Sequence, residues 1–314
     1  MKLLRMVKIK DLLTLQDLSP AEILGLIKLT RSIKGETATK QIRGALFGKH
    51  VVLLFQKPST RTRVSFEVAI EKLGGSSTFL ASREAQLSRG ETVADTAKVL
   101  SQYADAIVAR VYQHAFLIEM AKHADVPVVN ALSDLYHPVQ VLSDLFTIQE
   151  ARGRLRGVKL AYIGDGNNVC NSLLLGCSKV GIDLRVACPK EYEPPKGVVE
   201  KAYENARMSG SSVKITRDPL EACKDVEAVY TDTFISMGDE DERETRLKAF
   251  LPRYRVTPEF FKVAERDAIF LHCLPAHRGE EVAAEVIDGP NSMVWTQARN
   301  RVYTQQALLA ALLG

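Results

Sequence analysis

The chain has 314 residues, of which 46% are hydrophobic and 25% are charged, so it is long enough for two domains and too apolar to be disordered. Its formal charge of +4, from 42 basic and 38 acidic residues, argues against nucleic acid as a partner, and no lysine- or arginine-rich run changes that. No apolar stretch approaches the roughly 18 residues of a membrane span, and residues 1–8 lack the apolar core of a signal peptide, which predicts a cytoplasmic protein without membrane contact.

The first strong pattern along the chain is an apolar run followed by hydroxyl and guanidinium side chains. Val51–Phe55 predicts a buried parallel strand, which Pro58 ends. Ser59 and Thr60 are suited to cap a helix over 62–73, which stops at two glycines. Because a helix start carries unpaired N–H groups, the added hydroxyls and arginines predict an anion pocket. An ordinary capped helix with solvated arginines is the alternative.

The two arginines of this segment have different expected roles. Arg61 and Arg63 lie two residues apart, so on a helix they point to different faces. We assign Arg61 to the anion and expect Arg63 to be structural.

Further strands are expected downstream, with helical patterns between them. They cover 106–110, 126–130, 158–163, 183–187, 228–231 and 268–272. This alternation predicts an α/β fold of two doubly wound parallel-sheet domains. The charged segment 151–157 marks the expected junction, which divides the chain into domains 1–150 and 151–301. A C-terminal helix within 302–314 is expected to pack back on the first domain.

Polar side chains gather where these predicted strands end. Arg110 closes one strand, and His137 and Gln140 follow another after a short loop. In the second half, Asp232 and Cys273 each follow directly after a strand. Open parallel sheets bind ligands beyond the carboxyl ends of their strands. The convergence of Arg, His, Gln, Asp and Cys on that rim therefore predicts a functional site.

The cysteines indicate neither disulfides nor a structural metal. Their number, five, is odd, and no C-x-x-C pattern occurs. Four of them, at positions 170, 177, 188 and 223, are expected to be buried apolar residues.

Three segments together resemble a known family. Ser59-Thr60-Arg61-Thr62-Arg63, His137-Pro138-Val139-Gln140 and the run from His272 to Glu281 are similar to the signature motifs of the aspartate and ornithine carbamoyltransferases. The H-C-L-P element at 272–275, and Asp232 followed by Ser236-Met237-Gly238, resemble the ornithine carbamoyltransferases in particular. The resemblance covers nearly the whole chain.

The resemblance implies a domain that binds carbamoyl phosphate, a domain that binds L-ornithine, and catalysis in the cleft between them. The product would be L-citrulline plus phosphate, within arginine metabolism. The residues carried over for carbamoyl phosphate are Ser59, Thr60, Arg61, Thr62, Gln86, Arg110, His137, Gln140, Cys273, Leu274 and Arg301. Those for ornithine are Asn168, Asp232, Ser236 and Met237, and the catalytic set is Arg110, His137, Asp232 and Cys273.

The resemblance further implies a homotrimer, or a higher assembly of trimers, in which Gln86 reaches a neighbouring subunit's site.

The chemistry of carbamoyl transfer fits these residue types. The δ-amine attacks the carbamoyl carbon, and Arg110, His137 and Thr60 can donate hydrogen bonds to the oxyanion that develops. The departing phosphate can accept the proton, so neither a cofactor nor a metal is required.

Several alternatives stay open at this point. Another acceptor, namely aspartate, putrescine or an acylated ornithine, is the nearest alternative. An aspartate site needs basic groups for two carboxylates, and the loop 86–91 has no lysine, whereas Asp232 suits a cationic amine, which favours ornithine. A nicotinamide-dependent dehydrogenase would use the glycine turn Gly164–Asn168, which lacks the third glycine of G-x-G-x-x-G. A non-enzymatic binding protein is the third. The acidic segment 238–244 is either a mobile lid or a solvated helix face, and Leu274-Pro275 is a candidate cis peptide.

Overall fold

The computed structural model describes residues 8–35, 42, 44–236, 238 and 240–314. It divides the chain into two units, one made of residues 1–146 and 300–314 and the other of residues 147–299. The division falls inside helix α6 (Pro138–Arg152), just before the charged segment 151–157. The last helix, α13 (Val294–Leu313), also contributes to both units.

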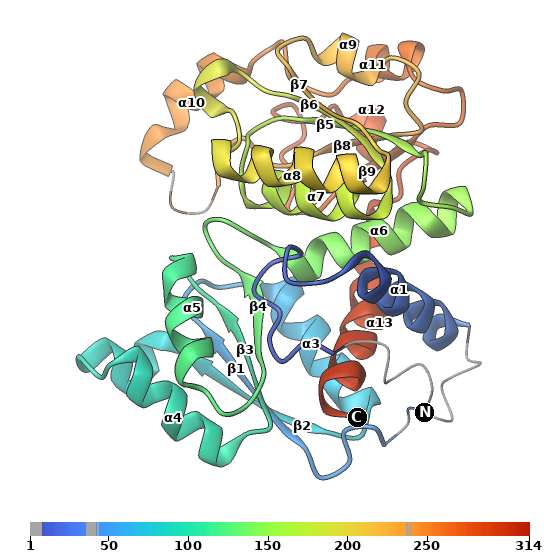
Figure 1. Cartoon of the computed structure of the whole chain (residues 1–314). Helices are drawn as coiled ribbons and strands as arrows, with labels where there is room; N and C mark the ends of the chain where they lie inside the picture. The colour runs from blue at the N-terminus through green and yellow to red at the C-terminus, as the bar shows by residue number, and fades with distance from the viewer. Residues whose placement is uncertain (1–7, 36–41, 43, 237, 239) are drawn as a thin grey trace. The chain divides into compact units, whose positions relative to one another are not determined.

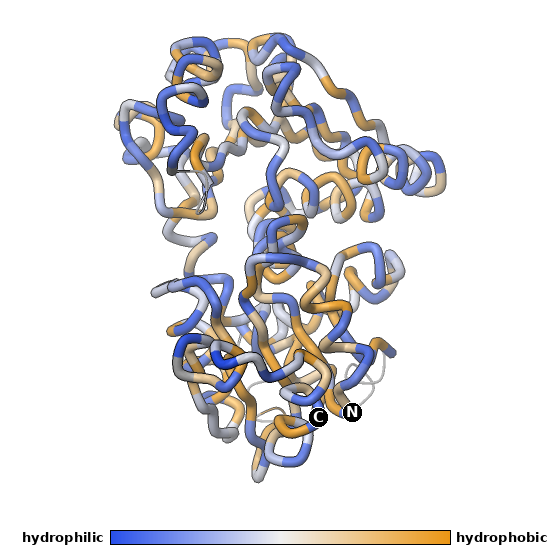
Figure 2. The backbone as a smooth tube through the Cα atoms, turned by 90° about the vertical axis from the view of Figure 1, so that its left-hand side faces the viewer, coloured by the Kyte–Doolittle hydropathy of each residue, from blue (hydrophilic) through white to orange (hydrophobic). Residues whose placement is uncertain are grey.

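The first unit is built on a four-stranded parallel sheet in the order β2-β1-β3-β4 (Figure 1). The strands are β1 (His50–Phe55), β2 (Ser76–Ala81), β3 (Ala106–Arg110) and β4 (Val128–Leu132). Its helices are α1 (Pro20–Lys34), α3 (Thr60–Lys72), α4 (Val93–Tyr103) and α5 (His114–His123), with short 3-10 turns η2 (Ser82–Glu84) and η3 (Gln86–Arg89). In Figure 2 the inner strands of this unit are coloured as hydrophobic segments.

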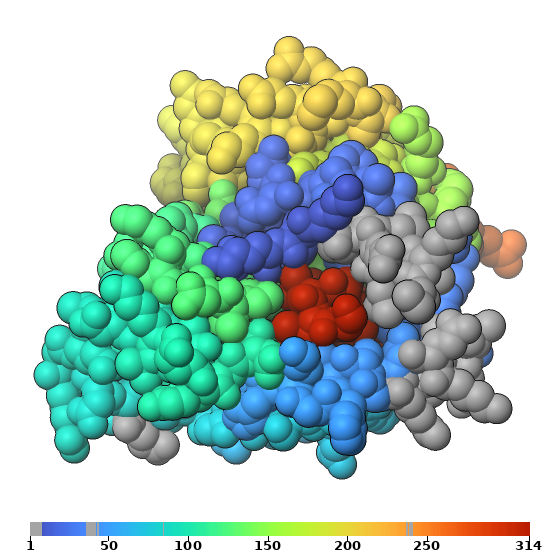
Figure 3. Space-filling model, turned by 60° about the horizontal axis from the view of Figure 1, so that its bottom comes forward, coloured from blue at the N-terminus to red at the C-terminus, as the bar shows by residue number. Residues whose placement is uncertain are grey.

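Helix α13 begins at Val294 rather than near Tyr303, where the sequence pattern placed a helix. Its early turns carry polar side chains that are buried and hydrogen-bonded, so their hydrophilic pattern hid the helix. In the first unit the middle of α13 contacts α1 and α3, because Lys34 donates to Asn300 over 2.8 Å and Arg301 donates to Thr62 over 2.8 Å. Figure 3 shows the carboxyl end of the same helix, in red, beside dark-blue and light-blue segments of this unit.

The second unit contains a five-stranded parallel sheet in the order β7-β6-β5-β8-β9. The strands are β5 (Lys159–Ile163), β6 (Asp183–Ala187), β7 (Val213–Thr216), β8 (Ala228–Thr231) and β9 (Ile269–His272). Its remaining elements are α7 (Asn168–Val180), η4 (Lys190–Tyr192), α8 (Lys196–Ser209), α9 (Pro219–Cys223), η5 (Glu240–Glu242), α10 (Arg243–Phe250), α11 (Pro258–Val263) and α12 (Ala284–Ile287).

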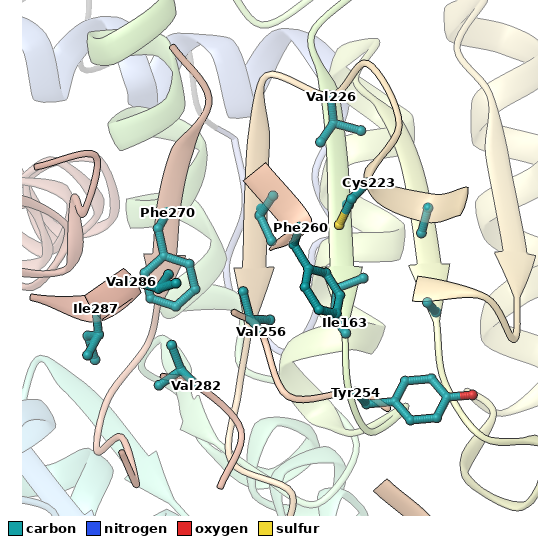
Figure 4. Close-up of a cluster of buried hydrophobic side chains, with 14 of the residues drawn as sticks. Ile163, Cys223, Val226, Tyr254, Val256, Phe260, Phe270, Val282, Val286 and Ile287 are labelled. Atoms are coloured by element: carbon teal, nitrogen blue, oxygen red, sulfur yellow. The ribbon is translucent and has the colours of Figure 1, made fainter. Parts of the chain in front are cut away.

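Aromatic and branched side chains form the core on one face of this second sheet. Figure 4 shows Ile163 of β5 and Phe270 of β9 facing Phe260 of α11 and Val256 across a cluster of buried side chains. Phe250 stacks on Phe234 with ring centroids 4.5 Å apart. The cluster holds the connections after β8 and β9 against the sheet, and two of the predicted acceptor residues, Asp232 and Ser236, lie on the connection after β8.

Within each sheet the paired strands end at the same edge, with one register shift between β3 and β4 at Ala109/Arg110. In the first unit Phe55 pairs with Arg110, and Arg110 pairs with Leu132. In the second unit Ile163 pairs with Thr231, and Thr231 pairs with His272. The predicted doubly wound parallel sheets are therefore confirmed. No helix in the described ranges is long and apolar enough to cross a membrane.

Candidate functional site

The predicted anion pocket begins at the amino end of α3. The hydroxyl of Ser59 accepts a hydrogen bond from the Thr62 N–H over 3.2 Å, which confirms the predicted cap one residue before the helix. Thr60 is exposed and Arg61 half-buried. Among the described residues, Arg61 has neither an ion-pair nor a hydrogen-bond partner. Its guanidinium charge therefore remains available to an anion at this helix start.

Arg63 is engaged elsewhere, as expected. Its Nε lies 2.9 Å from a carboxylate oxygen of Glu67, one helical turn along. Its guanidinium carbon also lies 3.7 Å from the ring centroid of Phe79, which is a close cation–π contact. Arg63 thus fastens α3 to the edge strand β2.

Arg301 connects two of the other predicted residues. It is buried, and its two terminal nitrogens donate to Gln140 Oε1 over 3.0 Å and to Thr62 Oγ1 over 2.8 Å. Gln140 in turn donates to Asp144 over 2.8 Å. A single guanidinium from the C-terminal helix therefore fixes the amino ends of α3 and α6 relative to each other within the first unit.

His137 is fully buried beside this cluster. Burial is the largest cause that lowers its pKa well below the usual value, and the charges of Arg301 and Arg110 lower it further. The imidazole is accordingly neutral near pH 7. A neutral imidazole keeps one N–H group, so His137 can donate a hydrogen bond to an oxyanion while the two nearby arginines carry the positive charge.

In the second unit, Asp232 is the centre of the predicted acceptor site. It follows β8 directly and is 5% exposed. Its Oδ1 accepts from the Cys273 thiol over 2.9 Å and from the Thr233 N–H over 2.8 Å. Its Oδ2 accepts from the Asn167 amide over 2.9 Å. The structure therefore brings Asp232 and Cys273 together, as strand ends in register require.

The turn after β9 is held by a buried pair. Leu274 has φ 59°, a left-handed conformation that is costly for a leucine, and the Leu274-Pro275 peptide is cis as predicted. The Leu274 N–H donates to His272 Nδ1 over 2.9 Å, and His272 Nε2 lies 3.2 Å from Glu281 Oε1. His272 and Glu281, which had no assigned task, thus hold the turn that presents Cys273 and Leu274.

Two groups of side chains in the second unit have potential metal-ligand atoms close together, and the hydrogen bonds just described involve the members of one group. Ligand atoms of Asp232, His272 and Cys273 lie within 4.8 Å of one another, and so do those of His277, Glu280 and Glu281. Each member of the first group already has a hydrogen bond in this network. The arrangement is explained without an ion.

The remaining predicted residues lie on η3, at the start of α7 and after β8. Gln86 lies exposed on η3, and within the described ranges its side chain makes no hydrogen bond to the other predicted site residues. Asn168 begins α7 and Ser236 lies after β8, both half-buried. Met237 lies outside the described residues. Sequence reasoning missed Asn167, whose signal was its place before an apolar helical run.

The cysteines are as expected. The four away from the site are buried, and Cys273 is half-buried. Burial raises the pKa of Cys188 and of Cys223 to about 12.

Comparison with known proteins decides the family. Residues 10–150 match the family model described as "Aspartate/ornithine carbamoyltransferase, carbamoyl-P binding domain", and residues 156–312 match "Aspartate/ornithine carbamoyltransferase, Asp/Orn binding domain". The chain belongs to the aspartate/ornithine carbamoyltransferase family. The two matches together cover most of both units, from residue 10 to residue 312 apart from residues 151–155.

Several relatives that are similar to this chain are named ornithine carbamoyltransferase. The chain is 53% identical to ornithine carbamoyltransferase of Bacillus subtilis, over 97% of this chain and 94% of that one, and 51% identical to that of Pyrococcus horikoshii, over 98% and 97%. Among solved structures, ornithine carbamoyltransferase from Pyrococcus furiosus superposes with a TM-score of 0.93 at 50% identity, covering 97% of both chains. The anabolic enzyme of Campylobacter jejuni gives 0.91 at 43% identity, over 97% of this chain and 99% of that one.

Proposed function

We propose that this protein transfers the carbamoyl group of carbamoyl phosphate to the δ-amine of L-ornithine, giving L-citrulline and phosphate. The observation that carries the choice of acceptor is the Asp232 carboxylate, which the Cys273 thiol and the Asn167 amide hold at the rim of the second sheet. A buried anionic group suits an acceptor whose reacting end is a cation. The identity of about half to proteins named ornithine carbamoyltransferase supports the same acceptor.

The first unit supplies the groups for the donor substrate. Ser59, Thr60, Arg61 and Thr62 bind the phosphate at the start of α3. Arg110, His137 and Gln140 hold the carbamoyl group, and Arg301 fixes Thr62 and Gln140 in place. The proposed carbamoyl phosphate-binding set also includes Cys273 and Leu274, which follow β9 in the second unit.

The reaction then follows from charge. The neutral ornithine amine forms a bond to the carbamoyl carbon, and the carbonyl oxygen becomes an oxyanion stabilised by Arg110, His137 and Thr60. The bond from carbon to the phosphate oxygen breaks, and the released phosphate carries away the electron pair and accepts the proton of the amine. Asp232 orients the amine, which at a lysine-like pKa near 10.4 is neutral in only about one molecule in two thousand at pH 7.

A dehydrogenase is disfavoured by the glycine turn after β5. The Gly166 N–H donates to the Tyr192 carbonyl over 2.8 Å, and a Cβ added at Gly166 would come within 2.4 Å of the Pro194 nitrogen. The loop that follows β6 therefore packs directly on this glycine. A glycine is therefore required here because the protein's own backbone lies against it, and no approach of a cofactor's pyrophosphate is needed to explain it.

The test is a ureido-product assay with carbamoyl phosphate and three acceptors, ornithine, aspartate and putrescine. The proposal expects citrulline from ornithine and little product from the other two. A higher kcat/KM with aspartate or putrescine would assign the protein to another acceptor. Binding of carbamoyl phosphate without product from any acceptor would indicate a binding protein.

We also propose a homotrimer in which the Gln86 loop completes a neighbouring subunit's site. The support is that the Gln86 side chain is exposed on η3 and, within the described ranges, makes no hydrogen bond to the predicted phosphate-binding residues of its own chain.

A further inference from the structure

Asn167 occupies a position that serves two elements at once. It is the residue before α7, and its Oδ1 accepts hydrogen bonds from the Val169 N–H over 3.0 Å and the Cys170 N–H over 3.2 Å. Because two backbone N–H groups face this end of the amide, it must be the oxygen, and the other end must be the NH₂ group. The orientation of the side chain is therefore fixed by the helix.

The NH₂ end points to the acceptor site. It donates to Asp232 Oδ2 over 2.9 Å, while the other oxygen of that carboxylate accepts from Cys273 and Thr233. Both oxygens of Asp232 thus have donors, which sets the plane of a nearly buried carboxylate. Of these donors, Asn167 alone is itself anchored by a helix start. Tyr162 adds a further contact, with its hydroxyl 3.3 Å from Asn167 Oδ1.

Capping alone does not explain an asparagine here. Serine, threonine and aspartate cap a helix about as well, because each offers an oxygen to the same N–H groups. None of them has an NH₂ group that could donate to Asp232 at the same time. The amide is the side chain that performs both tasks.

We infer that Asn167 is a positioning residue for carbamoyl transfer, whose amide orients the Asp232 carboxylate toward the acceptor's amine. This inference rests on the proposed function. Asn167 acts through Asp232 rather than on the substrate, so its loss should affect the use of ornithine and not the binding of carbamoyl phosphate.

The test separates capping from positioning with three variants. Asn167→Ser and Asn167→Asp keep an oxygen for the cap and lose the NH₂ group that donates to Asp232, and the shorter serine hydroxyl does not extend to the position of that group, whereas Asn167→Ala loses both the cap and the NH₂ group. Steady-state constants for each substrate and the thermal midpoint are measured for all of them. Since hydrogen bonds to charged groups are strong, kcat/KM for ornithine should fall about ten- to a hundredfold in Asn167→Ser, and further in Asn167→Asp, which places a second carboxylate beside Asp232.

The expected pattern is selective. In Asn167→Ser and Asn167→Asp, KM for carbamoyl phosphate stays within about twofold of wild type. The thermal midpoint of Asn167→Ser should fall less than that of Asn167→Ala, because the cap remains, whereas Asn167→Asp should lose more than Asn167→Ser because its second carboxylate lies beside Asp232. Asn167→Ala should lose thermal stability as well as the use of ornithine.

Three results would overturn the inference. A wild-type kcat/KM for ornithine in Asn167→Ser would show a cap and nothing more. Equal losses for both substrates would show a general structural role. A wild-type protein that forms no citrulline would overturn the proposed function, and the inference with it. If the wild type forms citrulline normally, a negative result with the variants overturns only the role inferred for Asn167.

Discussion

At the scale of single residues, the two arginines at the start of α3 offer a matched pair. Arg61→Ala should raise KM for carbamoyl phosphate by about ten- to a hundredfold, because it removes charged donors to an anion. The fold should persist, since Arg61 has no ion-pair or hydrogen-bond partner within the described ranges. Initial rates at varied carbamoyl phosphate, with a thermal scan, measure both effects.

The control is Arg63→Ala, which removes the contacts with Glu67 and Phe79. It should lower the thermal midpoint slightly and leave KM for carbamoyl phosphate nearly unchanged. If Arg63→Ala weakened the donor substrate more than Arg61→Ala, the assignment of the two side chains would be reversed.

His137 predicts a pH dependence of stability. Its pKa in the folded protein is lowered, so below the unfolded value of about 6.5 the unfolded chain takes up a proton that the native state does not. Wild-type stability from this group is therefore complete near pH 7 and is lost as the pH falls toward 5. In His137→Gln this contribution is absent.

The measurement is the free energy of unfolding of both proteins between pH 7 and pH 5. The wild type should lose up to about 1.4 kcal/mol per pH unit more than His137→Gln. The lowered pKa of His114 is common to both proteins and cancels in the difference. If the free energy of unfolding of the wild type minus that of His137→Gln stayed constant or increased as the pH fell, a neutral, buried His137 would be contradicted.

At the scale of elements, Arg246 fastens α10 to the glycine turn after β5. Its guanidinium lies 2.8 Å from Asp165 and 3.3 Å from the Phe234 carbonyl, and the side chains of Arg246 and Asp165 are 12% and 11% exposed. Removing one partner of such a pair leaves a buried charge. Arg246→Met should therefore cost about 3–5 kcal/mol.

Urea unfolding of two further variants checks this mechanism. Asp165→Asn combined with Arg246→Met should recover part of the loss, because the buried charge is removed. Arg278→Met breaks an exposed pair with Asp288 and should leave the urea midpoint near wild type. A full loss in the double variant would mean that packing, not the ion pair, holds α10.

The sequence predicted every inner strand but only two of the four edge strands, β4 and β9. The inner strands β1 and β3 contain the unbroken apolar runs 51–55 and 106–109, so their pattern is unambiguous. The edge strands β2 and β7 were not predicted, because they are partly exposed and read Ser-Ser-Thr-Phe-Leu-Ala and Val-Lys-Ile-Thr. Pairing with a neighbouring strand forms them, and no local pattern reports that.

The same limit applies to the site. Residues at strand ends, such as Arg110 and Asp232, could be predicted because parallel strands end at one edge. The contact of Arg301 with Gln140 joins residues far apart in the chain, and the contact of Asn167 with Asp232 joins different strands. Only the folded chain shows these contacts.

At the scale of the whole molecule, a trimer with shared sites predicts complementation. At carbamoyl phosphate concentrations well below the raised KM, Gln86→Ala and Arg61→Ala chains should each be nearly inactive, yet mixed trimers contain sites with Arg61 from one chain and Gln86 from the other. Random mixing after dissociation should restore about a quarter of wild-type activity, since each half of a site comes from the required parent about half the time. No recovery from verified mixed trimers would place both residues in the same chain's site.

Carbamoyl transfer from carbamoyl phosphate to ornithine is tested most directly by following both products in one reaction. With carbamoyl phosphate and L-ornithine, the account predicts citrulline and inorganic phosphate in equal amounts, each dependent on both substrates. Phosphate release without citrulline, or citrulline no faster than in the enzyme-free reaction, would contradict it.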